Sequence, residues 1–238
     1  MQSSLKIGSI MGIPIKLGSS FLLALPISAY FTALNSQPFG FAEVEPPIVR
    51  YALSVLSAVL LFASVLLHEL AHSYFAKRYG YNIDSITLFL FGGVASMEIP
   101  KKPGQEAKMA FAGPLTSLII GSICLFIYSY IILPNPALSQ NSVYLIIWIL
   151  GSMNLVLGVF NLLPAFPMDG GRILRSFFTM KMSYIRATHS AASIGKFVAI
   201  LMALYGLYVG DLWLLLIAFY IYGSATNEER STQTWYSG

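Results

Sequence analysis

The sequence predicts an all-α polytopic membrane protein, and its composition and its charge distribution are the two observations that predict it. Of its 238 residues, 56% are hydrophobic and only 10% are charged, whereas soluble domains carry about 25% charged residues. The charges are also unevenly spread, because residues 17–42 and 109–168 contain no Lys, Arg, Asp or Glu. Apolar runs of about 17–25 residues let an α-helix cross the hydrocarbon core of a bilayer. We therefore expect a bundle of transmembrane helices.

Six transmembrane helices are predicted from the apolar runs. They are residues 18–34, 48–78, 106–133, 142–162, 184–209 and 211–224. Residues 5–17 contain two Gly and one Pro among β-branched residues and favour a short hairpin. Residues 83–97 alternate β-branched and aromatic side chains around a Gly pair, which favours a strand or hairpin. We expect a small interfacial β element near the N-terminus and after the second span.

The positions of Lys and Arg predict the orientation of the spans. Cytoplasmic loops of membrane proteins carry an excess of these residues. Most of them lie before the first span, between the second and third, between the fourth and fifth, and after the sixth, whereas residues 35–47 and 134–141 contain none. Both termini of a multi-pass cell-membrane protein are therefore expected in the cytoplasm.

The composition disfavours nucleic-acid binding and excludes an intramolecular disulfide. The formal net charge of +4 reflects the loop bias and not a nucleic-acid surface, because no basic face with interleaved aromatic residues is present. Cys124 is the single cysteine, so no intramolecular disulfide can form. The lipid bilayer is the expected environment, and no nucleic-acid partner is expected.

The second predicted span ends in a motif that carries chemistry, His68-Glu69-Leu70-Ala71-His72. Residues four apart share one face of a helix, so both imidazoles can reach a single Zn²⁺ ion. Glu69 lies beside them, where its carboxylate can take a proton from water at the metal. The alternative is a helix end that carries interfacial polar groups. Seventeen uncharged residues precede the motif, and ionisable groups at such a depth are usually functional.

A zinc site of this type needs a third protein ligand, and Asp169 is the best candidate. It follows two prolines and precedes Gly170-Gly171, which permit close approach of the backbone. By the predicted orientation, Asp169 and the two histidines lie at the cytoplasmic ends of their spans. The alternative role of Asp169 is to cap a helix over residues 172–178, and capping and metal binding are compatible.

These motifs resemble those of the site-2 protease family of intramembrane zinc metalloproteases, particularly its six-span archaeal and bacterial members. The resemblance covers nearly the whole chain. It rests on His68–His72 and the Asn161…Asp169-Gly170 segment, with support from two shorter motifs. The supporting motifs are Phe91-Gly92-Gly93-Val94-Ala95 and Ala112-Gly113-Pro114-Leu115.

The resemblance implies roles for individual residues. It implies that His68, His72 and Asp169 bind one zinc ion and that Glu69 is the general base. The family's Asn, eight residues before the Asp, matches Asn161, which becomes a candidate donor to the oxyanion of the tetrahedral intermediate. The alternative for Asn161 is an amide that packs between helices.

The implied function is regulated intramembrane proteolysis. A hydrolase of this type cuts a single-span membrane protein within its transmembrane helix, near the cytoplasmic end, and releases a cytoplasmic fragment. The main alternative is a non-catalytic transporter or metal carrier. A transport pathway would need a series of acidic or histidine residues across the predicted outer leaflet as well, and the spans have no such series there. A membrane protease of the prenyl-protein type would use a Glu as third ligand, and no suitable Glu follows the motif.

The chain is expected to form a single membrane-embedded protease core over residues 1–238. Many family members carry a PDZ domain, but no segment between spans has the roughly 80–100 residues that such a domain needs. Only fourteen residues follow the sixth span, too few for the nucleotide-sensing CBS domains of other members. Either the chain is a minimal core, or a regulatory domain or partner lies outside this sequence.

Three further features each have two interpretations. Gly92-Gly93 could form a simple turn or an edge strand that pairs with an unwound substrate segment. Asn154 could hydrogen-bond to the site or to a neighbouring span. His189 is expected to be an interfacial or packing histidine and not a ligand.

Overall fold

The protein is described here by a computed structural model that covers residues 4–89, 92–97, 102 and 104–237. The chain divides into two compact units. The first unit consists of Met1–Glu98 and Leu115–Gly158, and the second consists of Ile99–Pro114 and Val159–Gly238. The boundaries fall inside two helices, α3 (Gln105–Ile127) and α5 (Leu145–Asn161).

The longest helix is α2 (Pro47–Arg78), which belongs to the first unit together with α1 (Phe21–Leu34). Pro47 occupies the first turn of α2, where its missing N–H group costs no hydrogen bond. Lys77 and Arg78 lie in the last turn, where cations interact favourably with the helix dipole. Between α3 and α5 lie three short helices, η1 (Tyr128–Ile132), α4 (Pro136–Ser139) and η2 (Ser142–Tyr144).

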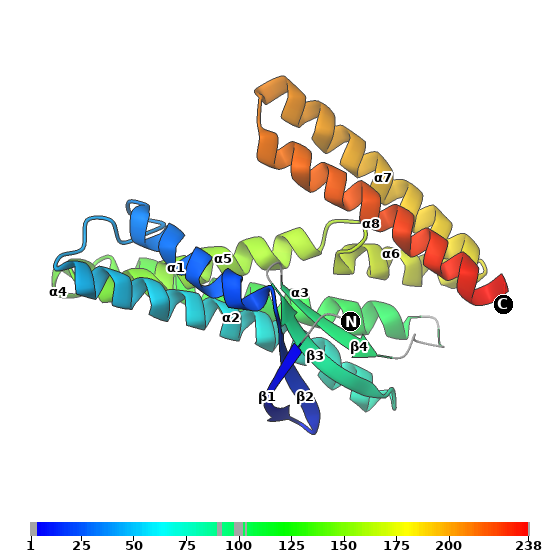
Figure 1. Ribbon diagram of the computed structural model, residues 1–238, viewed down its shortest axis with the longest axis horizontal. Helices are drawn as coiled ribbons and strands as arrows, with labels where there is room; N and C mark the ends of the chain where they lie inside the picture. The colour runs from blue at the N-terminus through cyan, green and yellow to red at the C-terminus, as the bar shows by residue number, and fades with distance from the viewer. Residues whose placement is uncertain (1–3, 90–91, 98–101, 103, 238) are drawn as a thin grey trace. The chain divides into compact units, whose positions relative to one another are not determined.

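A four-stranded sheet packs on α2. Its strands, in the order β1-β2-β3-β4, are β1 (Ser4–Ile10), β2 (Ile13–Gly18), β3 (Ile83–Phe89) and β4 (Gly92–Met97). The β1–β2 and β3–β4 pairs are antiparallel, as expected for the two predicted hairpins. The β2–β3 pair is parallel and joins the two hairpins into one sheet, which the sequence alone did not predict. Figure 1 shows these strands beside the C-terminal half of α2.

An apolar core holds the sheet against α2. Ile15 of β2 and Ile86 of β3 are buried, together with Ile13, Phe21 and Leu88. Half-buried side chains from α2 pack on this core: Phe62, Val65, Leu66 and Leu70. These residues surround the turn of α2 that carries His68 and Glu69, so the sheet fixes the position of that turn.

The opposite half of α2 packs on the segment 35–46 and on α5. Phe41, Leu53 and Ile149 belong to this second core of the first unit. The α3 and α5 helices approach very closely, because a Cβ atom at Gly121 would lie 2.9 Å from the carbonyl oxygen of Gly151. The first unit is therefore held by apolar packing at both ends of α2.

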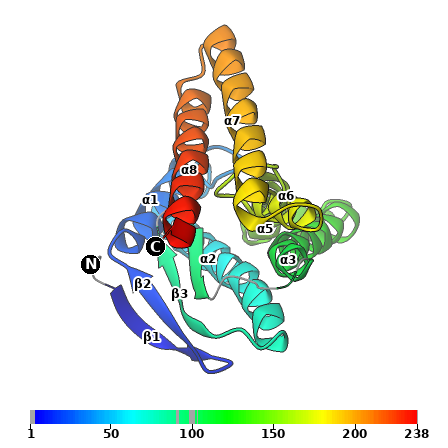
Figure 2. The ribbon, with the colours of Figure 1, turned by 90° about the vertical axis from the view of Figure 1, so that its right-hand side faces the viewer.

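The second unit is helical and contains α6 (Asp169–Thr179), α7 (Tyr184–Val209) and α8 (Leu212–Ser237). Figures 1 and 2 show α7 and α8 side by side as a long hairpin. Gly210 ends α7 with a φ of 73°, a left-handed conformation that favours glycine. The Asp211 carboxylate accepts hydrogen bonds from the Trp213 and Leu214 amides at 2.9 and 3.2 Å and so starts α8.

All six segments predicted to span the membrane are helical. Among the described residues, four helices are long and apolar enough to cross a bilayer, Pro47–Arg78, Gln105–Ile132, Ser142–Asn161 and Tyr184–Val209. The α1 helix is apolar but shorter. The α8 helix continues well past the predicted end at residue 224 and carries charged residues in its C-terminal half. The chain is thus a mostly helical membrane protein with a small sheet.

Candidate metal centre

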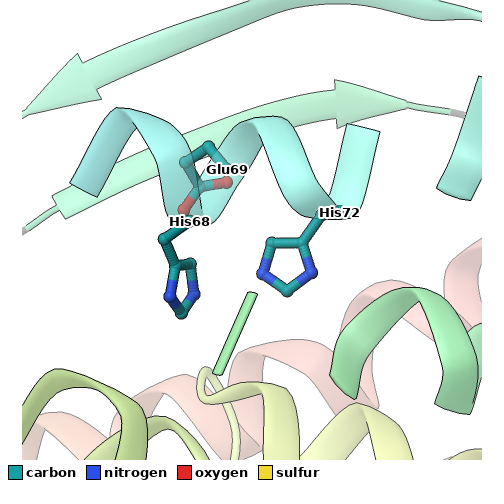
Figure 3. Close-up of side chains that lie close together, drawn as sticks. All are labelled: His68, Glu69 and His72. Carbon is teal, nitrogen blue, oxygen red and sulfur yellow. The ribbon is translucent and has the colours of Figure 1, made fainter. Parts of the chain in front are cut away.

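The His68 and His72 side chains extend from the same side of α2 (Figure 3). Their ring centroids lie 4.9 Å apart, and the ring planes meet at 78°. Each histidine is only 3% exposed. The one-face geometry predicted from the spacing is confirmed, because one turn of an α-helix separates residues four apart.

Glu69 completes a cluster of potential metal ligands. One ligand atom from each of His68, Glu69 and His72 lies within 4.8 Å of the others. Imidazole nitrogens and carboxylate oxygens are ligands that Zn²⁺ accepts. The donor set of this cluster therefore fits a zinc ion, and Glu69 lies close enough to act on a group bound beside the histidines.

The Glu69 side chain packs against the backbone of β4 at Gly93. A Cβ atom at Gly93 would lie 2.3 Å from Cγ of Glu69, far inside van der Waals contact. A side chain at this position would have to displace the Glu69 side chain, which glycine leaves in place. Gly92 and Gly93 pair with Phe89 and Leu88 of β3. The interpretation of this Gly pair as a simple turn is therefore wrong, while Phe91 of the same motif lies outside the described residues.

Polar side chains from α3 and α5 contact the buried face of α2. Nδ1 of His68 lies 2.9 Å from Oγ of Ser117 on α3, and both residues are buried. The Asn154 amide on α5 donates to Oγ of Ser64 at 3.0 Å, one turn before His68. Asn154 therefore binds a neighbouring helix, one of the two roles predicted for it. Ser117 was not predicted, because nothing local in the sequence pairs it with His68.

The sequence matches the model of peptidase family M50 over residues 56–135 and 129–204. This matched region contains the metal-binding cluster and most of the chain. The chain belongs to peptidase family M50. For this M50 protein, the resemblance to the site-2 protease family is confirmed.

Two curated relatives and one solved structure illustrate the similarity. A zinc metalloprotease of Methanocaldococcus jannaschii is 40% identical over 230 residues, covering 97% of this chain and 62% of the relative. Stage IV sporulation protein FB of Bacillus subtilis is 27% identical over 158 residues, covering 65% of this chain and 50% of the relative. The solved structure of a site-2 protease from M. jannaschii matches with a TM-score of 0.65 and 39% identity, covering 95% of each chain. The M50 protein described here thus spans less than two thirds of the length of these curated relatives.

Asp169, the predicted third ligand, is the first residue of α6 in the second unit and is 6% exposed. One of its carboxylate oxygens lies 3.8 Å from Nη1 of Arg172. The N-cap of α6 is Met168, which makes no side-chain capping bond, so the alternative role of Asp169 as the N-cap is wrong. Its role as a metal ligand stays a prediction.

Asn161 and His189 also lie in the second unit. Asn161 is half-buried and forms the C-terminal residue of α5, and its catalytic role stays a prediction. His189 lies on α7 and is exposed, and its Nδ1 is hydrogen-bonded to the Glu229 carboxylate of α8. This arrangement agrees with an interfacial histidine that takes no part in the metal cluster.

A buried ion cluster in the second unit was also missed by sequence reasoning. The Arg175 guanidinium donates to Glu106 and to Glu228, with shortest distances of 2.5 Å to each. It also lies over the rings of Phe166 and Tyr184, at 5.0 and 4.9 Å from their centroids. Burial alone would lower the pKa of Arg175, but the charge of Glu106 and its hydrogen bonds raise that pKa above its ordinary value. This arginine therefore stays charged and joins the N-terminal end of α3, α6 and α8.

Proposed function

We propose that this chain is the core of an intramembrane zinc metalloprotease. The observation that carries the proposal is the convergence of His68, Glu69 and His72 on α2, a helix long and apolar enough to span a membrane. Relatives named as zinc metalloproteases and membership of peptidase family M50 support it. A hydrolytic site placed on such a helix suits substrates that are themselves in the membrane.

In this proposal, His68, His72 and Asp169 hold one zinc ion. Three protein ligands leave one coordination position open, as catalytic zinc sites require. When bound, the ion supplies Lewis-acid chemistry, making water more acidic and polarising the peptide carbonyl. The burial of both histidines supports a ligand role, because a buried imidazole is fixed in direction.

Glu69 acts as the general base in the proposed reaction. Its carboxylate takes the proton of the attacking water and returns it to the leaving amine. The close contact with Gly93 restricts the Glu69 side chain near the two histidines. Asn161 donates from its side-chain amide to the carbonyl oxygen as negative charge develops there.

The proposed topology is six transmembrane helices with both termini in the cytoplasm of a multi-pass cell-membrane protein. The six spans correspond to α1, α2, α3, α5, α7 and the apolar part of α8. The Lys and Arg distribution supports this orientation. It directs the C-terminal end of α2, and with it the metal cluster, toward the cytoplasmic side. The sheet then lies at the membrane interface.

We propose single-span membrane proteins as substrates, cut near the cytoplasmic end of their transmembrane helix. The backbone of such a helix is shielded by its own hydrogen bonds, so it must unwind locally before attack. Within the described residues, β4 is the last strand of the sheet, and its Gly93 contacts the proposed general base. An unwound substrate segment pairing with β4 would therefore pass beside Glu69.

The test is cleavage of candidate single-span substrates by purified protein in detergent. We expect a zinc chelator to abolish cleavage and added zinc to restore it. Replacing the base in E69Q should reduce the rate by about 10²–10⁴-fold, the usual contribution of a general base, while zinc content stays normal. Full activity of E69Q would overturn the assignment. Zinc flux across vesicles that is unaffected by E69Q would instead support the transporter alternative.

A further inference from the structure

The contact between His68 on α2 and Ser117 on α3 suggests a role beyond packing. Nδ1 of His68 and Oγ of Ser117 lie 2.9 Å apart, and Ser117 is completely buried. The two residues are 49 positions apart in the chain, so the tertiary fold and not a local turn brings them together.

We propose that Ser117 is a positioning residue that sets the tautomer and ring direction of His68 for metal binding. The inference rests on the proposed function, in which His68 is a zinc ligand. A neutral imidazole carries its proton on one nitrogen and accepts or binds metal through the other. With the Nδ1–H group donating to the serine oxygen, Nε2 is left unprotonated and available to the zinc ion.

Hydrogen bonds to the far nitrogen of a metal-binding histidine are known to matter for metal affinity in general. They fix the ring and its tautomer, and loss of such a partner typically costs about 10–100-fold in affinity or activity. The usual partners are carboxylates, backbone carbonyls and water. In this chain a buried hydroxyl from a neighbouring helix occupies that place.

A neighbouring contact on α2 provides a matched control. Ser64 lies one turn before His68 and accepts a hydrogen bond from Asn154 of α5 at 3.0 Å. Ser64 and Ser117 are both buried serines in interhelical hydrogen bonds of similar length, at 5% and 0% exposure. Only the Ser117 bond reaches a proposed ligand. Removing either hydroxyl should affect helix packing similarly, but only one should affect zinc.

The experiment measures zinc dissociation constants of the full chain in detergent, by competition with a chromophoric chelator, together with the thermal midpoint of the metal-free protein. We expect S117A to raise the dissociation constant about 10–100-fold and S64A to leave it within about threefold of wild type. Co²⁺ in place of zinc should show an altered visible absorption spectrum in S117A and an unaltered one in S64A. If S117A does not fold, S117C is measured, since its thiol has a similar size but is a weak acceptor, and a smaller loss in the same direction is expected.

Two results would overturn the inference. One is a folded S117A, or a folded S117C in its absence, that binds zinc as tightly as wild type. The other is an equal loss of affinity in S64A and S117A. The variant H68A separates this failure from failure of the proposed function. If H68A binds zinc as tightly as wild type, the assignment of His68 as a ligand fails, and the Ser117 inference fails with it. If H68A loses zinc affinity but S117A does not, only the role of Ser117 is overturned.

Discussion

Two buried polar clusters among the described residues differ in whether they contain their own cation. In the second unit, Arg175 binds two glutamates, and Arg175 and Glu106 are 4% and 3% exposed. In the first unit, the cluster consists of two imidazoles and a carboxylate, with its ligand atoms within 4.8 Å. A buried cluster that includes its counter-ion is complete within the fold. A cluster made of metal-ligand groups gains from binding a cation supplied from outside, and this difference separates a structural role from a functional one.

The largest effect on stability is expected at the self-contained cluster. R175M would leave Glu106 as a buried carboxylate without its main partner, which costs about 3–5 kcal/mol in the free energy of unfolding. Among the described residues, Arg172 is then the remaining cation in an ion pair with Glu106, at 3.9 Å. The measurement is reversible denaturation in detergent.

The matched control for R175M is E228Q. Its side chain is 37% exposed, so its loss removes a partner that water can replace. We expect E228Q to cost about 1 kcal/mol or less. Equal costs for R175M and E228Q, or a cost below about 1 kcal/mol for R175M, would contradict the interpretation that this cluster stabilises the fold.

A smaller effect, dependent on metal, is expected at the first-unit cluster. A ligand that binds only the native state stabilises it by about 2.7 kcal/mol at a concentration of 100 times Kd. Wild type should show this increment with zinc, whereas H72A should show almost none at the same zinc concentration. E228Q, which leaves the cluster intact, should keep the full increment. A zinc-dependent increment in H72A equal to that of wild type would remove His72 from the ligand set.

The same comparison explains which features could be predicted from the sequence. The metal-binding histidines were found because their relation is local: a spacing of four residues places both on one face of a helix. The helices were found because each one is a long run of consecutive, mostly apolar residues. Each of these signals can be read within a single segment.

The missed features all depend on contacts between segments that are distant in the chain. Arg175 and Glu106 are 69 residues apart, and in the sequence Arg175 contributes only to the count of cytoplasmic charges. The Ser117–His68 contact and the parallel pairing of β2 with β3 are likewise long-range. The alternative role of Asp169 as an N-cap fails for a local reason instead, because the helix starts at Asp169 itself and not at Arg172.

The smallest effect is expected at the ion cluster between α7 and α8, which is partly exposed. Glu229 of α8 accepts from Lys196 at 2.6 Å and pairs with His189, which is 62% exposed. The hydrogen bond from Lys196 lowers the pKa of Glu229 below its ordinary value of 4.5, partly offset by burial and assisted by His189. Because the folded-state pKa is depressed, the stabilisation is present above pH 4.5 and is lost as the pH falls through the folded-state value.

This loss can be isolated by comparing wild type with E229Q at about pH 5 and about pH 3, on either side of the ordinary pKa of a glutamate. At the higher pH, wild type should exceed E229Q in the free energy of unfolding by about 1 kcal/mol, the upper end for ion pairs near the surface. At the lower pH this advantage should shrink, because the Glu229 carboxylate becomes protonated. An advantage that stays constant between the two values would show that the contact of α7 with α8 does not depend on this charge.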